Sequence, residues 1–192
     1  MRLLKYNEVF TKILEVKRSK FIAYIMPYEQ FNKQLEYLKK EHPKARHFVY
    51  AWRTLNEYSQ IVEQSSDDGE PKGTSGKPTL HVLAGNSLIN TAIITVRYFG
   101  GTKLGTGGLV RAYSDATNEL IKEVELEDYI DKIKLTMQIG YSQFEKFKYL
   151  LGSFSANISS QDFLSEYIEV KVEIASTLKD EFKESAKSLF YK

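Results

Sequence analysis

The chain has 192 residues with a formal net charge of +2, and 42% of them are hydrophobic and 27% charged. This composition, which includes 11 Phe and 13 Tyr residues, excludes a disordered chain. No apolar run approaches the ~20 residues that cross a bilayer, and the absence of cysteine excludes disulfides and thiolate metal sites. Because the first residues mix charge throughout and lack the apolar stretch of a signal peptide, we expect a cytoplasmic protein with no membrane partner.

Charge is unevenly distributed along the chain. Residues 1–120 carry +5 and residues 121–192 carry −3. All the arginines lie in the first part: Arg2, Arg18, Arg46, Arg53, Arg97 and Arg111. Because the planar guanidinium suits phosphate and carboxylate, an anionic partner is expected to meet the N-terminal part. The alternative is that +5 over this length is ordinary variation.

The first elements follow from hydrophobic periodicity. Short β-rich runs predict strands over 9–16 and 20–26. Apolar positions with helical spacing, starting at Tyr28, predict a helix that ends before Pro43. A third strand is predicted to follow, with one aromatic face made by Phe48, Tyr50 and Trp52.

Glycine-containing segments separate the next elements. We predict a polar loop over 63–76, a short helix over 77–86, and a strand over 88–99. That strand is so continuously apolar that it should be central and buried on both faces. A glycine loop over 100–108 then precedes a long amphipathic helix over 109–124.

The remaining sequence predicts a second domain. The acidic stretch 123–131 is the expected boundary, which divides the chain into domains 1–125 and 126–192. The pattern after it is β-α-β-β-α, as in a small ferredoxin-like domain, with no room for a closing fourth strand. The fold class expected is therefore α+β in two domains.

The polar loop contains three carboxylates within four positions: Asp67, Asp68 and Glu70. Oxygen ligands at this density could hold a hard cation such as Mg²⁺, although the spacing is not that of an EF-hand. The alternative is a structured connection in which these side chains bind the loop's own backbone.

The glycine loop joins a buried strand to a helix N-terminus. Free backbone N–H groups and the positive end of the helix dipole there favour anion binding. Neither a Walker A loop nor a G-x-G-x-x-G spacing is present, so ATP and NAD binding are not supported. The alternative is that the glycines allow close packing of helix on strand. The candidate anion-binding residues are Arg97, Gly100, Gly101, Lys103, Gly105, Gly107, Gly108 and Arg111, with His47 and Lys72 at the edge.

We assign no catalytic residue. The three histidines lack zinc-ligand spacing, and Ser75 lacks the spacing of a nucleophile elbow. Aromatic and basic residues interleave over 48–53 and 97–99, a pattern that suits base stacking if the rings are exposed. The alternative is that these rings belong to the core.

The two loops carry a family resemblance. The runs that carry it are Ser65–Pro71, Gly73–Pro78, Arg97–Gly101 and Gly107–Tyr113, with Arg18–Ile22 and His42–His47 upstream. They closely resemble the IMPACT family, in particular its YigZ-like bacterial members, over residues 10–125. The resemblance implies an N-terminal domain with the βαβ-type fold of the second domain of a ribosomal protein. It also implies a C-terminal domain similar to the fifth domain of elongation factor G.

The same resemblance implies a link to translation, because eukaryotic relatives regulate it by competing for an activator of a stress-responsive kinase. We expect a translation-related regulator or accessory protein that binds RNA or the ribosome, or a protein partner in the translation machinery, without a resident cofactor. One alternative is a Mg²⁺-dependent hydrolase or transferase acting on a small phosphorylated substrate. Another is a protein-interaction module that does not bind nucleic acid.

Overall fold

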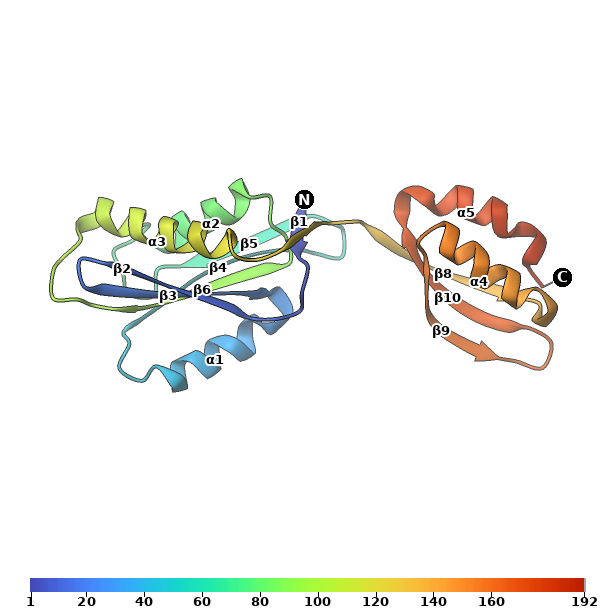
Figure 1. Cartoon of the computed structure of the whole chain (residues 1–192), viewed down its shortest axis with the longest axis horizontal. Coiled ribbons are helices and arrows are strands. Elements are labelled where there is room, and N and C mark those ends of the chain that lie inside the picture. The colour runs from blue at the N-terminus through green and yellow to red at the C-terminus, as the bar shows by residue number, and fades with distance from the viewer. Residues whose placement is uncertain (192) are drawn as a thin grey trace. The chain divides into compact units, whose positions relative to one another are not determined.

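The structure, a computed structural model, describes residues 1–191. It consists of two compact units, one spanning Met1–Tyr129 and one beginning at Ile130 (Figure 1). The first unit ends inside the acidic stretch 123–131 where the boundary is expected, but after residue 129 and not after residue 125. The reason is tertiary: β7 (Leu126–Asp128) pairs antiparallel with β1 (Arg2–Leu4), which ties the end of the first unit to its beginning.

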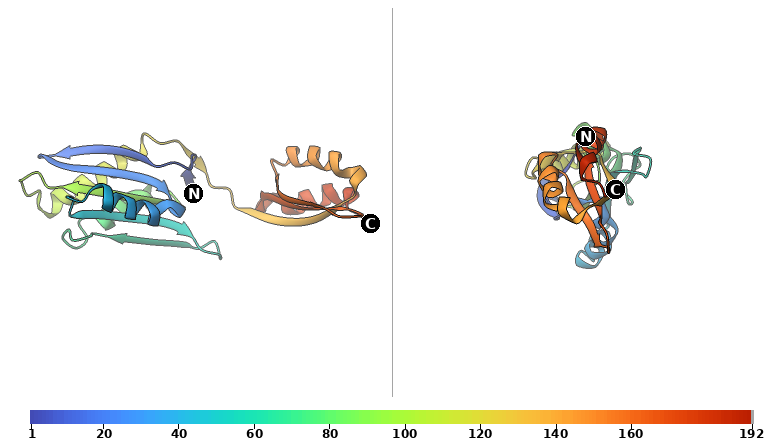
Figure 2. Two further views of the ribbon diagram at one scale, coloured as in Figure 1. Left: turned by 90° about the horizontal axis from the view of Figure 1, so that it is seen from below. Right: turned by 90° about the vertical axis from the view of Figure 1, so that its right-hand side faces the viewer.

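A five-stranded antiparallel sheet with the order β2-β3-β6-β4-β5 forms the centre of the first unit. Helices α2 and α3 cover one face and α1 covers the other (Figures 1 and 2). The strands are β2 (Phe10–Val16), β3 (Ser19–Pro27), β4 (His47–Leu55), β5 (Ile61–Ser66) and β6 (Thr91–Tyr98). The helices are α1 (Phe31–Glu41), α2 (Gly76–Gly85) and α3 (Gly105–Ile121).

The prediction of a central, doubly buried strand is confirmed by β6. All of its residues up to Arg97 are buried, and it lies between β3 and β4. Alternate residues of β6 enter different cores: Ile93 packs with Tyr113 beneath α3, and Ile94 packs with Phe31 of α1. The period-2 geometry of a strand places Arg97 on the α3 side, where the candidate site lies.

Two predictions for the first unit are wrong in part. The expected loop over 63–76 begins as strand β5, whose residues Ile61 to Gln64 are exposed and show no alternation of burial. Backbone pairing with β4, which no periodicity records, holds this edge strand in place. The final helix begins at Gly105 instead of 109, so Gly107 and Gly108 belong to its first turn instead of the preceding loop.

The second unit confirms the predicted β-α-β-β-α order. Strands β8, β10 and β9 pair antiparallel in that order, and α4 and α5 pack on one face of the sheet. A single antiparallel bridge joins Phe190 to Ile139 of β8, in the place that a fourth strand takes in a ferredoxin-like fold. The elements are β8 (Lys132–Ile139), α4 (Phe144–Ser153), β9 (Asn157–Phe163), β10 (Ile168–Ala175) and α5 (Lys179–Ala186). The two-domain α+β fold class is confirmed.

None of the helices formed by residues 1–191 combines the length and the apolar character that a membrane span requires.

Candidate functional site

Asp67 organises the loop between β5 and α2. Its Oδ1 accepts hydrogen bonds from the N–H of Ser75 (3.0 Å), the hydroxyl of Ser75 (2.7 Å) and the N–H of Gly76 (2.9 Å). Its Oδ2 accepts from the N–H of Gly73 at 2.7 Å. Burial by itself raises the pKa of the Asp67 carboxyl, but these hydrogen bonds outweigh burial and hold that pKa below its ordinary value.

This arrangement predicts a pH-dependent loss of stability in the Asp67→Asn variant. We expect the variant to lose about 1.5–3 kcal/mol of unfolding free energy at pH 7, because it removes charge-assisted hydrogen bonds. A carboxyl with a lowered folded-state pKa contributes its full stabilisation above its unfolded pKa of about 4, and that contribution disappears as the pH falls through the folded pKa. Urea unfolding of both proteins at pH 7 and near pH 3 measures the difference. An unchanged difference at the two pH values would contradict the role of the carboxylate.

Asp68 holds the start of β4. Its Oδ2 accepts from the N–H of Phe48 at 2.6 Å, and its backbone carbonyl lies 2.9 Å from Nδ1 of His47. Because a carbonyl oxygen only accepts, Nδ1 of His47 carries the hydrogen in this pair. The other ring nitrogen, Nε2, is therefore left to meet a ligand or solvent.

Glu70 and Arg97 form a buried ion pair. Nη1 of Arg97 donates to Oε1 of Glu70 at 2.6 Å, and the hydroxyl of Tyr113 donates to the same oxygen at 2.9 Å. Burial, together with the adjacent Glu70 charge, strongly raises the pKa of the Tyr113 hydroxyl, which therefore stays protonated as the donor. Nη2 of Arg97 lies 3.5 Å from Oγ of Ser19, while Nε, also buried, has no acceptor within the described chain.

These contacts correct two expectations from the sequence. The three carboxylates bind separate protein donors, and no group of three His, Cys, Asp or Glu residues among those described is arranged to hold a metal ion. Asp67, Asp68 and Glu70 therefore behave as the structured-connection interpretation expects, and they do not fit a Mg²⁺ site. Arg97 is also not a solvent-facing phosphate ligand, since it is only 6% exposed and is paired with Glu70.

A hollow of about 340 Å³ lies at the N-terminus of α3, and we call it the helix pocket. Within residues 1–191 no side chain caps this helix end, so the first N–H groups of α3 are open to a ligand. The walls combine Lys103 with apolar side chains, and the buried Arg97–Glu70 pair lies at one side. The lining residues are Glu70, Pro71, Arg97, Phe99, Lys103, Leu104, Gly105, Thr106 and Leu109.

A second hollow of about 200 Å³, here called the basic pocket, lies beside the helix pocket and shares Arg97 and Phe99 with it. Its other lining residues are Lys44, Arg46, His47 and Tyr98, so no carboxylate faces it directly. Strand register creates this cluster, because His47 of β4 pairs directly with Arg97 of β6.

The loop that carries Lys44 and Arg46 is anchored by His42. Nδ1 of His42 lies 3.0 Å from the hydroxyl of Tyr98, and Nε2 lies 3.0 Å from the hydroxyl of Tyr24. These bonds tie the end of α1 to β6 and β3. The His42–His47 run is thereby positioned along the sheet edge where the basic pocket opens.

Phe99 separates the two pockets and is 59% exposed. The guanidinium carbon of Arg97 lies 5.8 Å from the centre of the Phe99 ring and 5.4 Å from the centre of the Phe21 ring. Arg97 therefore makes a cation–π contact with each of these rings.

The packing interpretation of the glycine loop applies at Gly100 and not at Gly107. A Cβ on Gly100 would lie 2.0 Å from the backbone carbon of Arg18, so this glycine is required for packing. Gly107 has nothing within 4 Å of such a Cβ and has no positive φ, so neither packing nor conformation explains it.

Comparison with known proteins identifies the family. Residues 17–121 match the Impact N-terminal domain, and residues 137–190 match a domain of unknown function, DUF1949. The chain belongs to the IMPACT family. An IMPACT family member from Haemophilus influenzae is 36% identical over 152 residues, which cover 78% of this chain and 74% of that protein. IMPACT family member YigZ from Escherichia coli is 35% identical over 80% of this chain and 76% of its own length.

A solved structure resembles this chain over its whole length. The crystal structure of a protein described as hypothetical aligns with the whole of this chain and 97% of its own length, at a TM-score of 0.66 and 29% identity. The similarity thus extends through both domains of this IMPACT family chain. It supports the two-domain fold and assigns no ligand.

The remaining candidate residues of this IMPACT domain occupy separate places. Lys72 is exposed in the loop before α2, next to Pro71. Arg111 is exposed on α3 but lines another hollow, which contains Lys17 and Asp115, and is not brought together with Lys103 in the helix pocket. The anion-binding cluster expected from the sequence is therefore divided.

The sequence analysis missed one functional candidate and misplaced another. Lys44 was not considered. Phe99 belongs to the 97–99 pattern that suits base stacking, but it was expected inside the buried strand, whereas β6 ends one residue before it. The sequence signal for Lys44 is its place three positions before His47. Only the tertiary structure shows that Lys44 lies beside Phe99.

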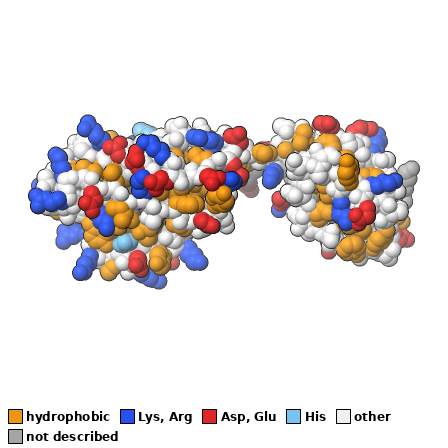
Figure 3. All heavy atoms as spheres, viewed as in Figure 1, with side chains coloured by type: hydrophobic (Ala, Val, Ile, Leu, Met, Phe, Trp, Pro, Cys, Tyr) orange, Lys and Arg blue, Asp and Glu red, His pale blue; other side chains and the backbone are white. Residues whose placement is uncertain are grey.

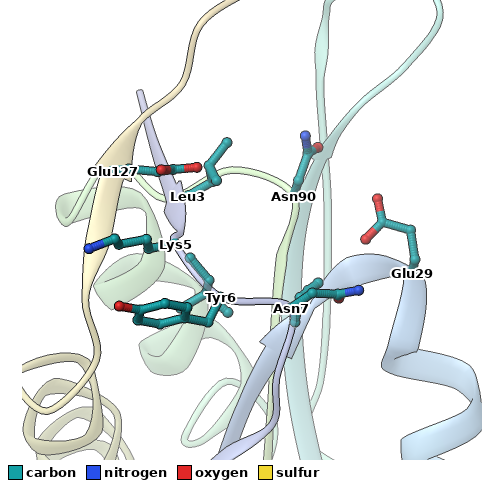
Figure 4. A pocket seen from close by; sticks show the side chains of 9 residues that line it. Leu3, Lys5, Tyr6, Asn7, Glu29, Asn90 and Glu127 are labelled. Carbon is teal, nitrogen blue, oxygen red and sulfur yellow. The ribbon is translucent and has the colours of Figure 1, made fainter. Parts of the chain in front are cut away.

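A fourth hollow of about 300 Å³ lies beside the β1–β7 ribbon of the first unit (Figure 4). The charged residues that line it are of both signs, Lys5, Glu29 and Glu127, and Lys5 pairs with Glu125 at 2.7 Å. Oδ1 of Asn90 accepts hydrogen bonds from Thr54 and Leu55. These contacts favour a structural role at the base of the ribbon.

Proposed function

We propose that this IMPACT family chain binds RNA, free or within the ribosome, through the helix pocket and the basic pocket. The observation that carries the proposal is the convergence at one edge of the sheet of an uncapped helix N-terminus and exposed cationic side chains. Phosphate is the ligand that such donors favour.

The electrostatics of the two pockets support the same partner. Lys44, Arg46 and Lys103 are exposed, whereas the one carboxylate that lines either pocket, Glu70, is neutralised by Arg97. Figure 3 shows Lys and Arg side chains gathered at the left-hand end of the first domain, where the β2–β3 turn and the β6–α3 loop lie in Figure 1. A patch of one sign attracts a polyanion and speeds its association.

A translation-related role is part of this proposal. Family membership supports it, because the resemblance drawn from the loop motifs connects eukaryotic members with the regulation of translation. The phosphate-rich surface of ribosomal RNA is a partner of the right chemistry for these pockets.

The proposal predicts weaker RNA binding by the double variant Arg46→Ala Lys103→Ala. We expect the affinity for a single-stranded RNA to fall about 10- to 100-fold, since each side chain supplies a charge-assisted contact to phosphate. The dependence of log affinity on log salt concentration should flatten by about one unit for each lost contact. Filter-binding titrations at several salt concentrations measure both quantities.

The matched control is Lys146→Ala Lys179→Ala, which removes the same charge from exposed positions of the second domain. This variant should bind as tightly as the wild type. If both variants lost the same RNA affinity, the loss would reflect the net charge of the chain and not the two pockets. Unchanged affinity in the site variant would overturn the proposal and favour a protein-interaction module, which nuclease-resistant co-purification would then detect.

A further inference from the structure

We infer that the site takes an unpaired nucleotide of a single RNA strand, with its base stacked on Phe99 and its flanking phosphates in the two pockets. This inference rests on the proposed function and names the form of RNA that the same site accepts. It begins from the ring of Phe99, which is 59% exposed although it directly follows the most buried strand of the chain.

The inner side of the Phe99 ring is already occupied. The guanidinium carbon of Arg97 lies within 6 Å of the centres of both the Phe21 and the Phe99 rings. The exposed part of the Phe99 ring can receive a further flat group, such as a nucleobase. Base stacking on an aromatic side chain tolerates any sequence, because every base has a π-face.

The backbone around Phe99 holds the ring in place before a ligand arrives. The N–H of Gly100 donates to Oγ of Ser19 at 3.1 Å, and Gly100 packs directly against the backbone of Arg18. On the other side, β6 is paired with β3 up to Tyr98. A ring held in this way loses little freedom when a base stacks on it, which favours affinity.

The pockets on either side of Phe99 supply phosphate donors. Lys103 and the first N–H groups of α3 lie in the helix pocket, and Lys44 and Arg46 lie in the basic pocket. A strand that crosses Phe99 can therefore place one phosphate in each pocket. In a duplex the base faces are stacked on their neighbours, so the ring has no base to receive.

The test uses the full chain and two short RNA probes. One carries the fluorescent base 2-aminopurine at its centre, and the other carries an abasic residue at that position. Wild-type protein should quench the 2-aminopurine on binding and should bind the intact RNA more tightly than the abasic RNA. Phe99→Ala should weaken binding of the intact RNA roughly 5- to 150-fold, abolish the quenching, and leave binding of the abasic RNA nearly unchanged.

Two further variants complete the experiment. Phe99→Trp keeps an aromatic face and should restore both affinity and quenching. Phe163→Ala removes a similarly exposed phenylalanine, 60% exposed, from the second domain and should behave as the wild type. Thermal melting of each variant separates loss of binding from loss of folding.

The outcomes distinguish the inference from the proposed function. If the wild type binds both RNAs equally and Phe99→Ala changes neither affinity, base stacking is refuted while phosphate binding stands. If the wild type prefers a duplex of the same sequence, the inference is likewise refuted. If the wild type binds none of the probes, the proposed function fails and the inference fails with it.

Discussion

Glu70→Ala should lower the unfolding free energy of the first domain by about 3–5 kcal/mol, because it leaves the buried Arg97 charge without its counterion. The Glu70 and Arg97 side chains are only 3% and 7% exposed, so water cannot replace the lost carboxylate without a rearrangement. The variant also removes the acceptor of the Tyr113 hydroxyl. Urea unfolding can be followed through Trp52, which is the one tryptophan of the chain and packs against Tyr28.

A surface ion pair provides the comparison for Glu70. Glu63 pairs with Arg53 at 3.0 Å, but the Glu63 side chain is 46% exposed. Glu63→Ala should therefore cost at most about 1 kcal/mol. Similar losses of unfolding free energy in Glu63→Ala and Glu70→Ala would contradict the argument that burial makes the Glu70–Arg97 pair more important.

A double variant separates the charge from the packing. Glu70→Leu with Arg97→Met removes both charges and keeps much of the apolar volume, so it should be more stable than Glu70→Ala. Failure to recover any stability would show that the cost arises from packing, or from the unpaired Tyr113 hydroxyl, and not from the isolated charge.

Gly100→Ala should destabilise the first domain by about 3 kcal/mol or more, because the added methyl group overlaps backbone atoms. Its Cβ would lie 2.0 Å from the carbon of Arg18, 2.3 Å from the oxygen of Arg18 and 2.2 Å from the nitrogen of Ser19. The overlap is relieved only if the β2–β3 turn and the start of the glycine loop move apart. That movement breaks the hydrogen bond from the N–H of Gly100 to Oγ of Ser19. The same urea titration measures the loss.

Gly107→Ala is the matched control for Gly100→Ala. It adds a methyl group to a helical position with open space around it, so the fold should gain about 0.5–1 kcal/mol. Equal stability of the two alanine variants would contradict the steric argument.

Local periodicity was sufficient for most elements of the fold. The continuous apolar run that ends in β6 predicted a central strand, and alternation over 168–174 predicted β10, because burial on a strand or helix repeats with a period set by the backbone. Edge strand β5 and the short strands β1 and β7 escaped prediction. They are held by pairing with distant strands, and their own residues alternate little in burial.

The candidate site was predicted only in its components. The sequence identified the glycine loop, Lys103 and His47, whose residue types alone suggest anion binding. It did not distinguish Arg97, which is buried against Glu70, from Arg46, which lines an open pocket. Arg97 and Arg46 each lie within two residues of a Phe or Tyr residue, and only the tertiary structure gives them different environments.

The sequence by itself therefore determined the two α+β domains, the order of most elements and the family, because periodicity and motif spacing are local properties of the chain. The tertiary structure alone decided the charges available to a ligand. Antiparallel pairing sets His47 beside Arg97, and burial pairs Arg97 with Glu70 across 27 positions of sequence. Such contacts depend on distances between segments far apart in the chain, which no local pattern encodes.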